Sequence, residues 1–193
     1  MKKIYFATRN KGKAHSLKRV LSEYGIKAIH IPMDLPEPKI DDLREIAKQK
    51  VITAYDRIKK PVIAIDSGFY IPSLKGFPGA FVNPVLKTIG IEGILKLTEA
   101  KPEKCEFKDC LAYRDGKSKQ PLVFESITSG VLSTKPRGEI GDEAWSKLWL
   151  IFIPEGEKKT LAETTSVEYL EWSKKHEQNS YAVQFAKWFL NQK

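Results

Sequence analysis

Cysteine and histidine are scarce in this chain, and each scarcity argues against a class of site. Two cysteines in 193 residues are too few for a disulfide-stabilised secreted scaffold or a cysteine-based zinc site. Cys105 and Cys110 lie in one predicted strand at an odd separation, so their side chains point to opposite faces and do not bridge. His15, His30 and His176 have no metal-ligand spacing, which argues against a transition-metal site.

Long apolar runs are also missing. The longest ones fall far short of the roughly 20 residues that span a bilayer, and the apolar segment behind Met1-Lys2-Lys3 is too short for a secretory signal. We therefore expect a cytoplasmic protein without a membrane partner. The chain has no repeat or low-complexity linker, and 41% apolar with 30% charged residues is ordinary for a globular protein, so we expect one domain over residues 1–193.

Basic residues are abundant, with 33 Lys and Arg against 24 Asp and Glu, for a net charge of +9. Such a charge is typical either of a nucleic-acid surface or of a lysine-rich exterior on a protein with an anionic small substrate. The lysines are dispersed, and no zinc-finger or RNP-like pattern accompanies them. The second interpretation is favoured, and we expect no specific nucleic-acid partner.

Hydrophobic periodicity predicts alternating strands and helices in the first half of the chain, followed mainly by strands. The predicted strands cover residues 3–7, 27–31, 62–65, 106–114, 122–129 and 148–154, and the predicted helices cover 12–24, 42–58, 84–99 and a segment at the end. Phe185 and Phe189 share one face of that last helix, which indicates core or dimer packing rather than base stacking. This order is typical of an α/β fold with a mixed sheet.

Asp66 is the first charged residue after the apolar run Val62–Ile65, at a predicted strand end. Its charge must find water, a cation or a metal, and Ser67 and Gly68 follow it with a hydroxyl and a bare backbone. Two interpretations are open: an Asx-type turn after a core strand, or a carboxylate at an active site.

The segment Thr8–Lys13 joins the first predicted strand to a predicted helix. The N–H groups at a helix N-terminus attract anions, and Arg9, Lys11 and Lys13 add positive charge. Phosphate is the obvious anion, although the segment has too few glycines for a Walker loop. A solvated basic turn is the alternative.

Glu45 lies near the start of the predicted helix 42–58, where acidic residues usually complement the helix dipole. Lys50 is five residues further and therefore not on the same face of the helix. A simple ion pair between Glu45 and Lys50 is not expected.

Together these segments resemble the inosine/xanthosine triphosphate pyrophosphatase family, whose members hydrolyse non-standard purine nucleoside triphosphates. The resemblance runs along nearly the whole chain. Its motifs are, in chain order, T-x-N-x-x-K at Thr8, Asn10 and Lys13; a Glu and a Lys at Glu45 and Lys50; the D-D-S-G turn at Ile65–Gly68; G-x-P-G at Gly76–Gly79; and later strands and turns at Thr128–Gly130, Pro136–Gly138 and Ile151–Glu163.

The resemblance implies a long mixed sheet flanked by helices, with two lobes and a central cleft, and a homodimer. It implies hydrolysis between the α and β phosphates with Mg²⁺, or Mn²⁺ in its place, to give a nucleoside monophosphate and pyrophosphate. Glu45 would bind the metal, and Asp66 would bind the metal or activate the attacking water. The remaining residues that would contact or support the phosphates are Thr8, Asn10, Lys13, Lys50, Ser67 and Gly68.

The second half of the chain departs from the family pattern. Residues 141–150 replace the G-F-G-[YW]-D-P segment, which puts Trp149 in place of an Asp and Ser146 in place of a stacking Phe. Trp149 or its neighbour Trp145 is a candidate to stack on the base, with a core role as the alternative.

The S-H-R motif is missing as well. Counting forward from Glu163 puts Ser173–Lys175 in its place, and counting back from the final helix puts residues 177–179 there. We prefer the first register because it keeps positive charge at Lys174 and Lys175, which we predict to contact the substrate; Tyr169 then replaces a lysine. An ammonium lacks the bidentate fork of a guanidinium, so base preference is open. The alternatives are a pyrophosphatase of altered or broader specificity and a homologue that binds nucleotides without turnover.

Overall fold

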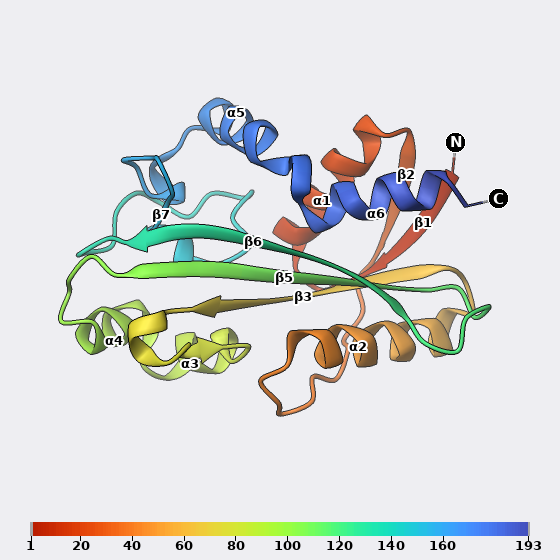
Figure 1. The fold of residues 1–193 in the computed structure, drawn as a ribbon, viewed down its shortest axis with the longest axis horizontal. Coiled ribbons are helices and arrows are strands. Elements are labelled where there is room, and N and C mark those ends of the chain that lie inside the picture. Colours follow the sequence, from red (N-terminus) through yellow and green to blue (C-terminus); the bar gives the residue numbers. More distant parts are fainter. Residues whose placement is uncertain (1, 193) are drawn as a thin grey trace. The chain divides into compact units, whose positions relative to one another are not determined.

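The computed structural model describes residues 2–192. Its strands are β1 (Lys2–Ala7), β2 (Ile26–Ile31), β3 (Val62–Tyr70), β4 (Pro78–Gly79), β5 (Lys104–Arg114), β6 (Leu122–Leu132) and β7 (Phe152–Pro154). Its helices are α1 (Lys11–Glu23), α2 (Leu43–Ile58), α3 (Val82–Thr88), α4 (Gly90–Leu97), α5 (Ser166–His176) and α6 (Tyr181–Leu190) (Figure 1). Short 3-10 turns are η1 (Pro72–Leu74), η2 (Lys147–Leu150), η3 (Leu161–Glu163) and η4 (Glu177–Asn179).

The strands form one mixed sheet in the order β2-β1-β3-β5-β6-β7, with β4 paired to β3. Strand β1 runs parallel to β2 and β3, whereas β3 with β4 and β6 with β7 are antiparallel. The predicted α/β fold with a mixed sheet is therefore confirmed.

The chain divides into two compact units, and β3, β5 and β6 each contribute to both. Unit 1 runs to Ser67 and includes Asp109–Ser126 and the segment from His176 onward. Unit 2 consists of Gly68–Lys108 and Ile127–Lys175. Each unit has its own apolar core.

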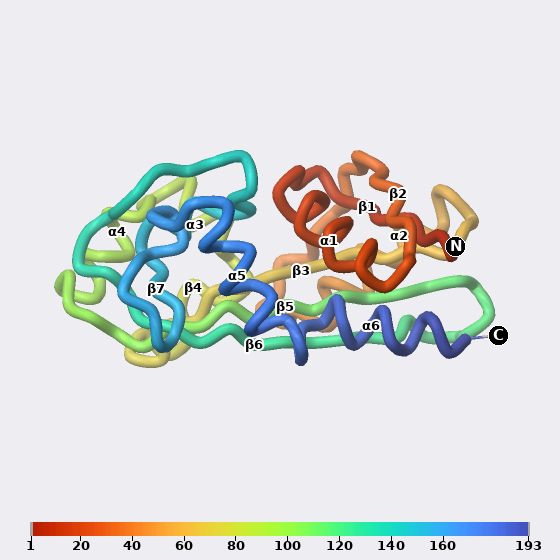
Figure 2. The backbone as a smooth tube through the Cα atoms, turned by 90° about the horizontal axis from the view of Figure 1, so that it is seen from above, coloured from red at the N-terminus to blue at the C-terminus, as the bar shows by residue number. Residues whose placement is uncertain are grey.

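The core of unit 1 lies between its strands and the two helices α1 and α6. Leu17 and Leu21 of α1 and Phe185 of α6 are fully or almost fully buried there, which confirms the predicted core role of the last helix. Figure 1 shows α2 on the opposite side of the strands. Figure 2 shows α6 lying along β6, where the Gln184 side-chain amide donates to the Glu125 carbonyl at 2.7 Å.

Unit 2 has a largely aromatic core. Phe107 lies between Phe69 and Phe152, with ring centroids 4.7 and 4.8 Å away, respectively. Cys105 is buried in the same core, and both it and Cys110 are free thiols, as predicted. No helix in the described part of the chain has the length and apolar content to cross a membrane.

Strand β3 does not end at Ile65, so the predicted turn at Asp66–Gly68 is wrong. Asp66 and Ser67 interrupt the apolar pattern, but both have partners on neighbouring elements, and Phe69 resumes the pattern in the core of unit 2. Gly68 permits close pairing, since a Cβ there would lie 2.8 Å from the Gly79 carbonyl oxygen. The strand therefore continues through its polar residues.

Three other elements differ from the prediction. The helix expected over 84–99 is two helices, because Gly90 takes a φ of +66° at the start of the second one. The strand expected over 148–154 begins with the turn η2, which the Ser146 hydroxyl caps by accepting from the Leu148 N–H. Helix α5 was not predicted.

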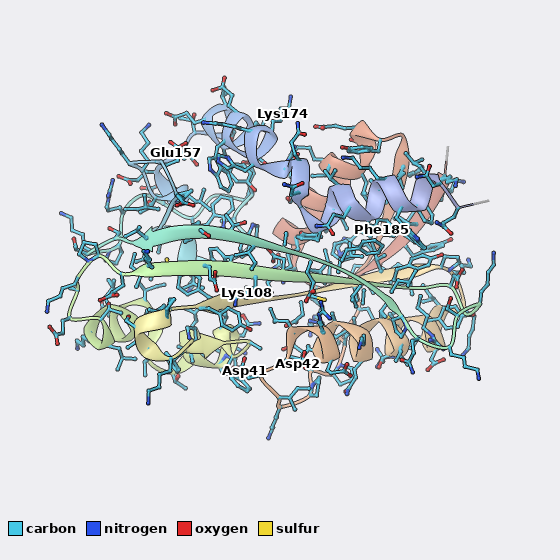
Figure 3. The ribbon with its side chains drawn as sticks, in the orientation of Figure 1. Asp41, Asp42, Lys108, Glu157, Lys174 and Phe185 are labelled. Carbon is cyan, nitrogen blue, oxygen red and sulfur yellow. The ribbon has the colours of Figure 1, made fainter. Side chains whose placement is uncertain are left out.

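Phe185 anchors α6 to the strands of unit 1, and Figure 3 shows its side chain pointing toward them. We expect Phe185→Ala to lower the free energy of unfolding by about 3–5 kcal/mol, because it leaves a cavity among aromatic rings. Leu190→Ala on the exposed end of the same helix is the control, with an expected loss below about 1 kcal/mol. Urea unfolding measures both, and equal losses would show that α6 is not held by this contact.

Candidate active site

The carboxylate of Asp66 lies in the middle of β3 and faces α2. The Lys50 ammonium donates to Asp66 Oδ1 at 2.8 Å and to Glu37 Oε1 at 2.8 Å, so one lysine joins a strand, a helix and the loop before the helix. The side chains of Lys50 and Asp66 are only 12% and 9% exposed, so their charges are shielded from water. No hydrogen bond to Asp66 Oδ2 is found among the described residues, which leaves this oxygen open to a water or a ligand.

The pKa values of this pair follow from burial and from each other. Burial raises the pKa of Asp66 above its ordinary value, and the positive charges of Lys50 and Lys13 only partly oppose that effect. Burial alone would lower the pKa of Lys50, but the carboxylates of Asp66 and Glu37 outweigh it and raise the pKa. A carboxylate with a raised pKa is a better proton acceptor near neutral pH than an exposed aspartate.

The segment Thr8–Lys13 folds as a helix start, as predicted. The Asn10 side-chain oxygen accepts from the Lys13 N–H at 2.9 Å, and the Thr8 hydroxyl accepts from the Asn10 N–H at 3.1 Å. A ring nitrogen of His30 lies 2.8 Å from the Thr8 carbonyl oxygen. These contacts hold the N-terminus of α1 in place beside the end of β1.

The three basic residues in this segment differ in their surroundings, and Lys13 is the least exposed of them. Arg9 pairs with Asp34 at 3.4 Å on the surface, and Lys11 is exposed. Burial lowers the pKa of Lys13, and the nearby charges of Asp66 and Asp109 counteract this. Within the described residues the Lys13 ammonium forms no ion pair, so it is a partly buried cation available to an anion.

Ser67 lies on the face of β3 opposite Asp66, because successive side chains alternate across a strand. Its hydroxyl donates to Asp109 Oδ1 on β5. Asp109 and Glu37 are the two charged residues near this site that the sequence did not identify. Asp109 interrupts the apolar pattern of β5, and this interruption is the feature of the sequence that could have identified it as a site residue.

Glu45 is placed by the cap of α2, where Asp42 Oδ1 accepts from the Glu45 N–H at 3.1 Å (Figure 3 labels Asp42). Its carboxylate pairs with Lys48 at 2.6 Å, so Glu45 and Lys50 form no pair with each other, as predicted. Among residues 2–192 no group of three or more His, Cys, Asp or Glu is able to hold a metal by itself. Mg²⁺ needs only one or two carboxylates when phosphates supply other ligands, and the oxygen donors Asp66 and Glu45 fit that requirement.

Comparison with known proteins assigns this chain to a family. The model of the Ham1 family matches residues 4–179. The chain belongs to the Ham1 family. A dITP/XTP pyrophosphatase of Methanopyrus kandleri is 39% identical over 190 residues, covering 98% of this chain and 97% of the relative. One from Pyrococcus horikoshii is 37% identical over 168 residues, covering 86% and 87%.

The fold of this Ham1 protein is also found among solved structures. A Ham1 protein from Coxiella burnetii superposes with a TM-score of 0.75 at 23% identity, covering 98% of this chain and 96% of that one. The family resemblance inferred from the motifs is confirmed.

The residues that replace the missing motifs of this Ham1 protein lie in unit 2. Lys174 and Lys175 are exposed near the end of α5, and Figure 3 shows Lys174 on the outer side of that helix. Trp149 is 4% exposed and packs on Tyr169, with ring centroids 4.8 Å apart. Trp149 and Tyr169 are therefore core residues of unit 2, whereas Trp145 is only partly buried.

Lys13 should contribute most of the anion affinity of the N-terminal segment. We expect Lys13→Ala to raise the Kd for inorganic tripolyphosphate about tenfold or more, because a charge-assisted contact is worth about 1.5–3 kcal/mol. Lys11→Ala, on the exposed side of the same turn, is the matched control and should change Kd less than about twofold. Titration calorimetry measures both. Equal effects of the two substitutions on Kd would show that this segment is only a solvated basic turn.

Proposed function

We propose that this protein hydrolyses non-standard purine nucleoside triphosphates, such as ITP, dITP and XTP, to the nucleoside monophosphate and pyrophosphate. One observation of the structure carries the proposal: the buried Asp66 carboxylate accepts from the Lys50 ammonium at 2.8 Å, beside an oxygen that has no hydrogen-bond partner among residues 2–192. A cation open to phosphate and a carboxylate open to water are what phosphoanhydride hydrolysis requires. The relatives named dITP/XTP pyrophosphatase support the same reaction.

In unit 1, some residues bind the phosphates and Asp66 accepts the proton. Lys13 contacts the phosphates, and the helix start at Thr8 and Asn10 holds it in position. Lys50 contacts the phosphates and orients Asp66 through their hydrogen bond. Asp66 Oδ2 accepts a proton from a water whose oxygen forms a bond to phosphorus, while the bridging bond between the α and β phosphates breaks and pyrophosphate leaves.

Mg²⁺, or Mn²⁺ in its place, would be held by Glu45 and Asp66 and would offset the charge of the phosphate oxygens. Asp66 either ligates this ion or activates the water, and both roles require its negative charge. Metal dependence, the homodimer and the cytoplasmic location remain predictions from the sequence.

A pyrophosphatase of altered or broader base preference is the second candidate function. The buried positions of Trp149 and Tyr169 favour it, because these residues stand where the family pattern has an Asp and a Lys. A pyrophosphate-release assay with ITP, XTP, dITP, standard triphosphates and modified pyrimidine triphosphates separates the two candidates. Release from no substrate would instead favour a homologue that only binds nucleotides.

Asp66→Asn should abolish pyrophosphate release, because it removes the charge with almost no change in volume. We expect a loss of at least about a hundredfold in kcat, the lower range for general acid–base catalysis. Asp56→Asn, which removes an exposed carboxylate paired with Lys59, is the control and should keep wild-type activity. Circular dichroism checks that both variants are folded. Wild-type turnover in the Asp66→Asn variant would show that Asp66 takes no part in the reaction.

Lys174 and Lys175 should weaken base discrimination relative to an arginine at the same place. We expect a preference for ITP over ATP or GTP that falls further in Lys174→Ala and Lys175→Ala, because each lost base contact costs about 1–3 kcal/mol of selectivity. Lys158→Ala, another exposed lysine of unit 2, is the control. The measurement is kcat/KM for ITP, XTP, GTP and ATP. Strong selectivity that survives both substitutions would show that the base is read by other residues.

A further inference from the structure

His30 lies near the end of β2, the edge strand that runs parallel to β1. Its ring nitrogen Nε2 lies 2.8 Å from the carbonyl oxygen of Thr8, the first residue after β1. A carbonyl oxygen only accepts hydrogen bonds, so Nε2 carries the hydrogen and donates it. The neutral ring with its hydrogen on Nε2 and the imidazolium both make this bond, so the contact does not require a charged ring.

The backbone of Thr8 is therefore held to β2 at both of its polar groups. Its N–H donates to the Ile31 carbonyl at 3.1 Å, and its carbonyl accepts from His30. The pairing of β1 with β2 ends at Ile31, so a side chain provides the second bond where the strand no longer does. Within residues 2–192, His30 is the only hydrogen-bond partner of this carbonyl.

The direction of the Thr8 carbonyl also sets the direction of the next N–H. The carbonyl of Thr8 and the N–H of Arg9 belong to one peptide unit, which is planar and trans, so they point in opposite directions. Because His30 holds the carbonyl toward β2, the Arg9 N–H points away from β2. His30 thus controls a group that it does not contact.

Three backbone N–H groups in this segment, those of Arg9, Lys11 and Gly12, have no acceptor in the described part of the chain. Such groups at the start of a helix are donors to anions. Lys11 and Gly12 belong to α1, so the helix itself orients their N–H groups. Arg9 precedes the helix, and the direction of its N–H therefore depends on the hydrogen bond made by His30.

We propose that His30 is a positioning residue of the phosphate site, which orients the Arg9 N–H toward the triphosphate by holding the Thr8 carbonyl. This inference rests on the proposed function for the identity of the substrate. Without His30, the peptide between Thr8 and Arg9 is free to rotate, and a carbonyl oxygen that turns toward the phosphates repels them. His30 therefore strengthens phosphate binding without touching the phosphates.

The test compares the Kd for inorganic tripolyphosphate, measured with Mg²⁺ present, among variants of His30. His30→Leu and His30→Phe remove the donor, and we expect Kd to rise on the order of tenfold, as for loss of one charge-assisted hydrogen bond. His30→Gln keeps an N–H at the end of its side chain and should stay within about threefold of the wild type. All three variants lack the imidazolium charge, so an effect of charge alone would be equal in all of them.

His15→Leu is the matched control, because it removes another histidine, on an exposed position of α1. It should change Kd less than about twofold. For ITP, we expect KM to follow Kd in the His30 variants and kcat to stay within about threefold of the wild type, because the contact concerns binding. Circular dichroism checks that each variant is folded.

The amide signal of Arg9 in a nitrogen-15 NMR spectrum reports the contact directly. When tripolyphosphate is added, we expect the Arg9 amide proton to shift downfield in the wild type and in His30→Gln but not in His30→Leu. A purely structural role of His30 would not make this signal depend on the donor at residue 30. The wild-type response requires no variant, so it tests the inference even where an apolar variant does not fold.

Three results would overturn the inference. They are an unchanged Kd in both apolar variants, a His30→Gln variant as weak as the apolar ones, and an Arg9 amide that does not respond in the wild type. The readouts also keep this inference apart from the proposed function. If the wild type binds tripolyphosphate but releases no pyrophosphate from any triphosphate, the proposed function fails while the Kd comparison still tests His30. If the wild type does not bind tripolyphosphate at all, the positioning role of His30 is refuted.

Discussion

The ion pair between Asp66 and Lys50 is the interaction on which the site depends. It allows a charged carboxylate to lie inside a strand whose neighbours are apolar, where burial alone would favour the neutral acid. A buried ion pair of this kind contributes little net stability, because desolvation of both charges offsets their attraction. Its value lies in holding the Asp66 carboxylate at a fixed place, and Glu37 supports it through its own contact with Lys50.

The pleat of β3 gives the site two sides. Asp66 faces α2 and accepts a hydrogen bond from Lys50, whereas Ser67 faces the side of α1 and donates a hydrogen bond to Asp109. Adjacent residues of one strand thus reach separate groups of partners without competing for them. Burial lowers the pKa of Lys13 in α1, and the charges of Asp66 on one side and Asp109 on the other only partly oppose that effect.

The parts of the site that could be predicted from the sequence are those fixed by local interactions. The helix start at Thr8–Lys13 was predicted because a strand end, a basic segment and an apolar period lie next to one another in the chain. Glu37 and Asp109 were missed because their partners, Lys50 and Ser67, are distant in sequence. The strand end predicted at Ile65 was wrong for the same reason, since Lys50 and Asp109, the partners of Asp66 and Ser67 within β3, are distant in sequence.

Unit 1 is assembled from segments at both ends of the chain. The Lys2 ammonium donates to the carbonyl oxygens of Phe189 and Leu190 at 2.9 and 3.0 Å, so hydrogen bonds join β1 to α6. During synthesis, α1 and β1 emerge before unit 2, but the helix that covers their core, α6, emerges only after unit 2 has been translated. The nascent chain must therefore keep an incomplete apolar face until α6 has been translated, which makes α6 the step that commits unit 1 to its native fold.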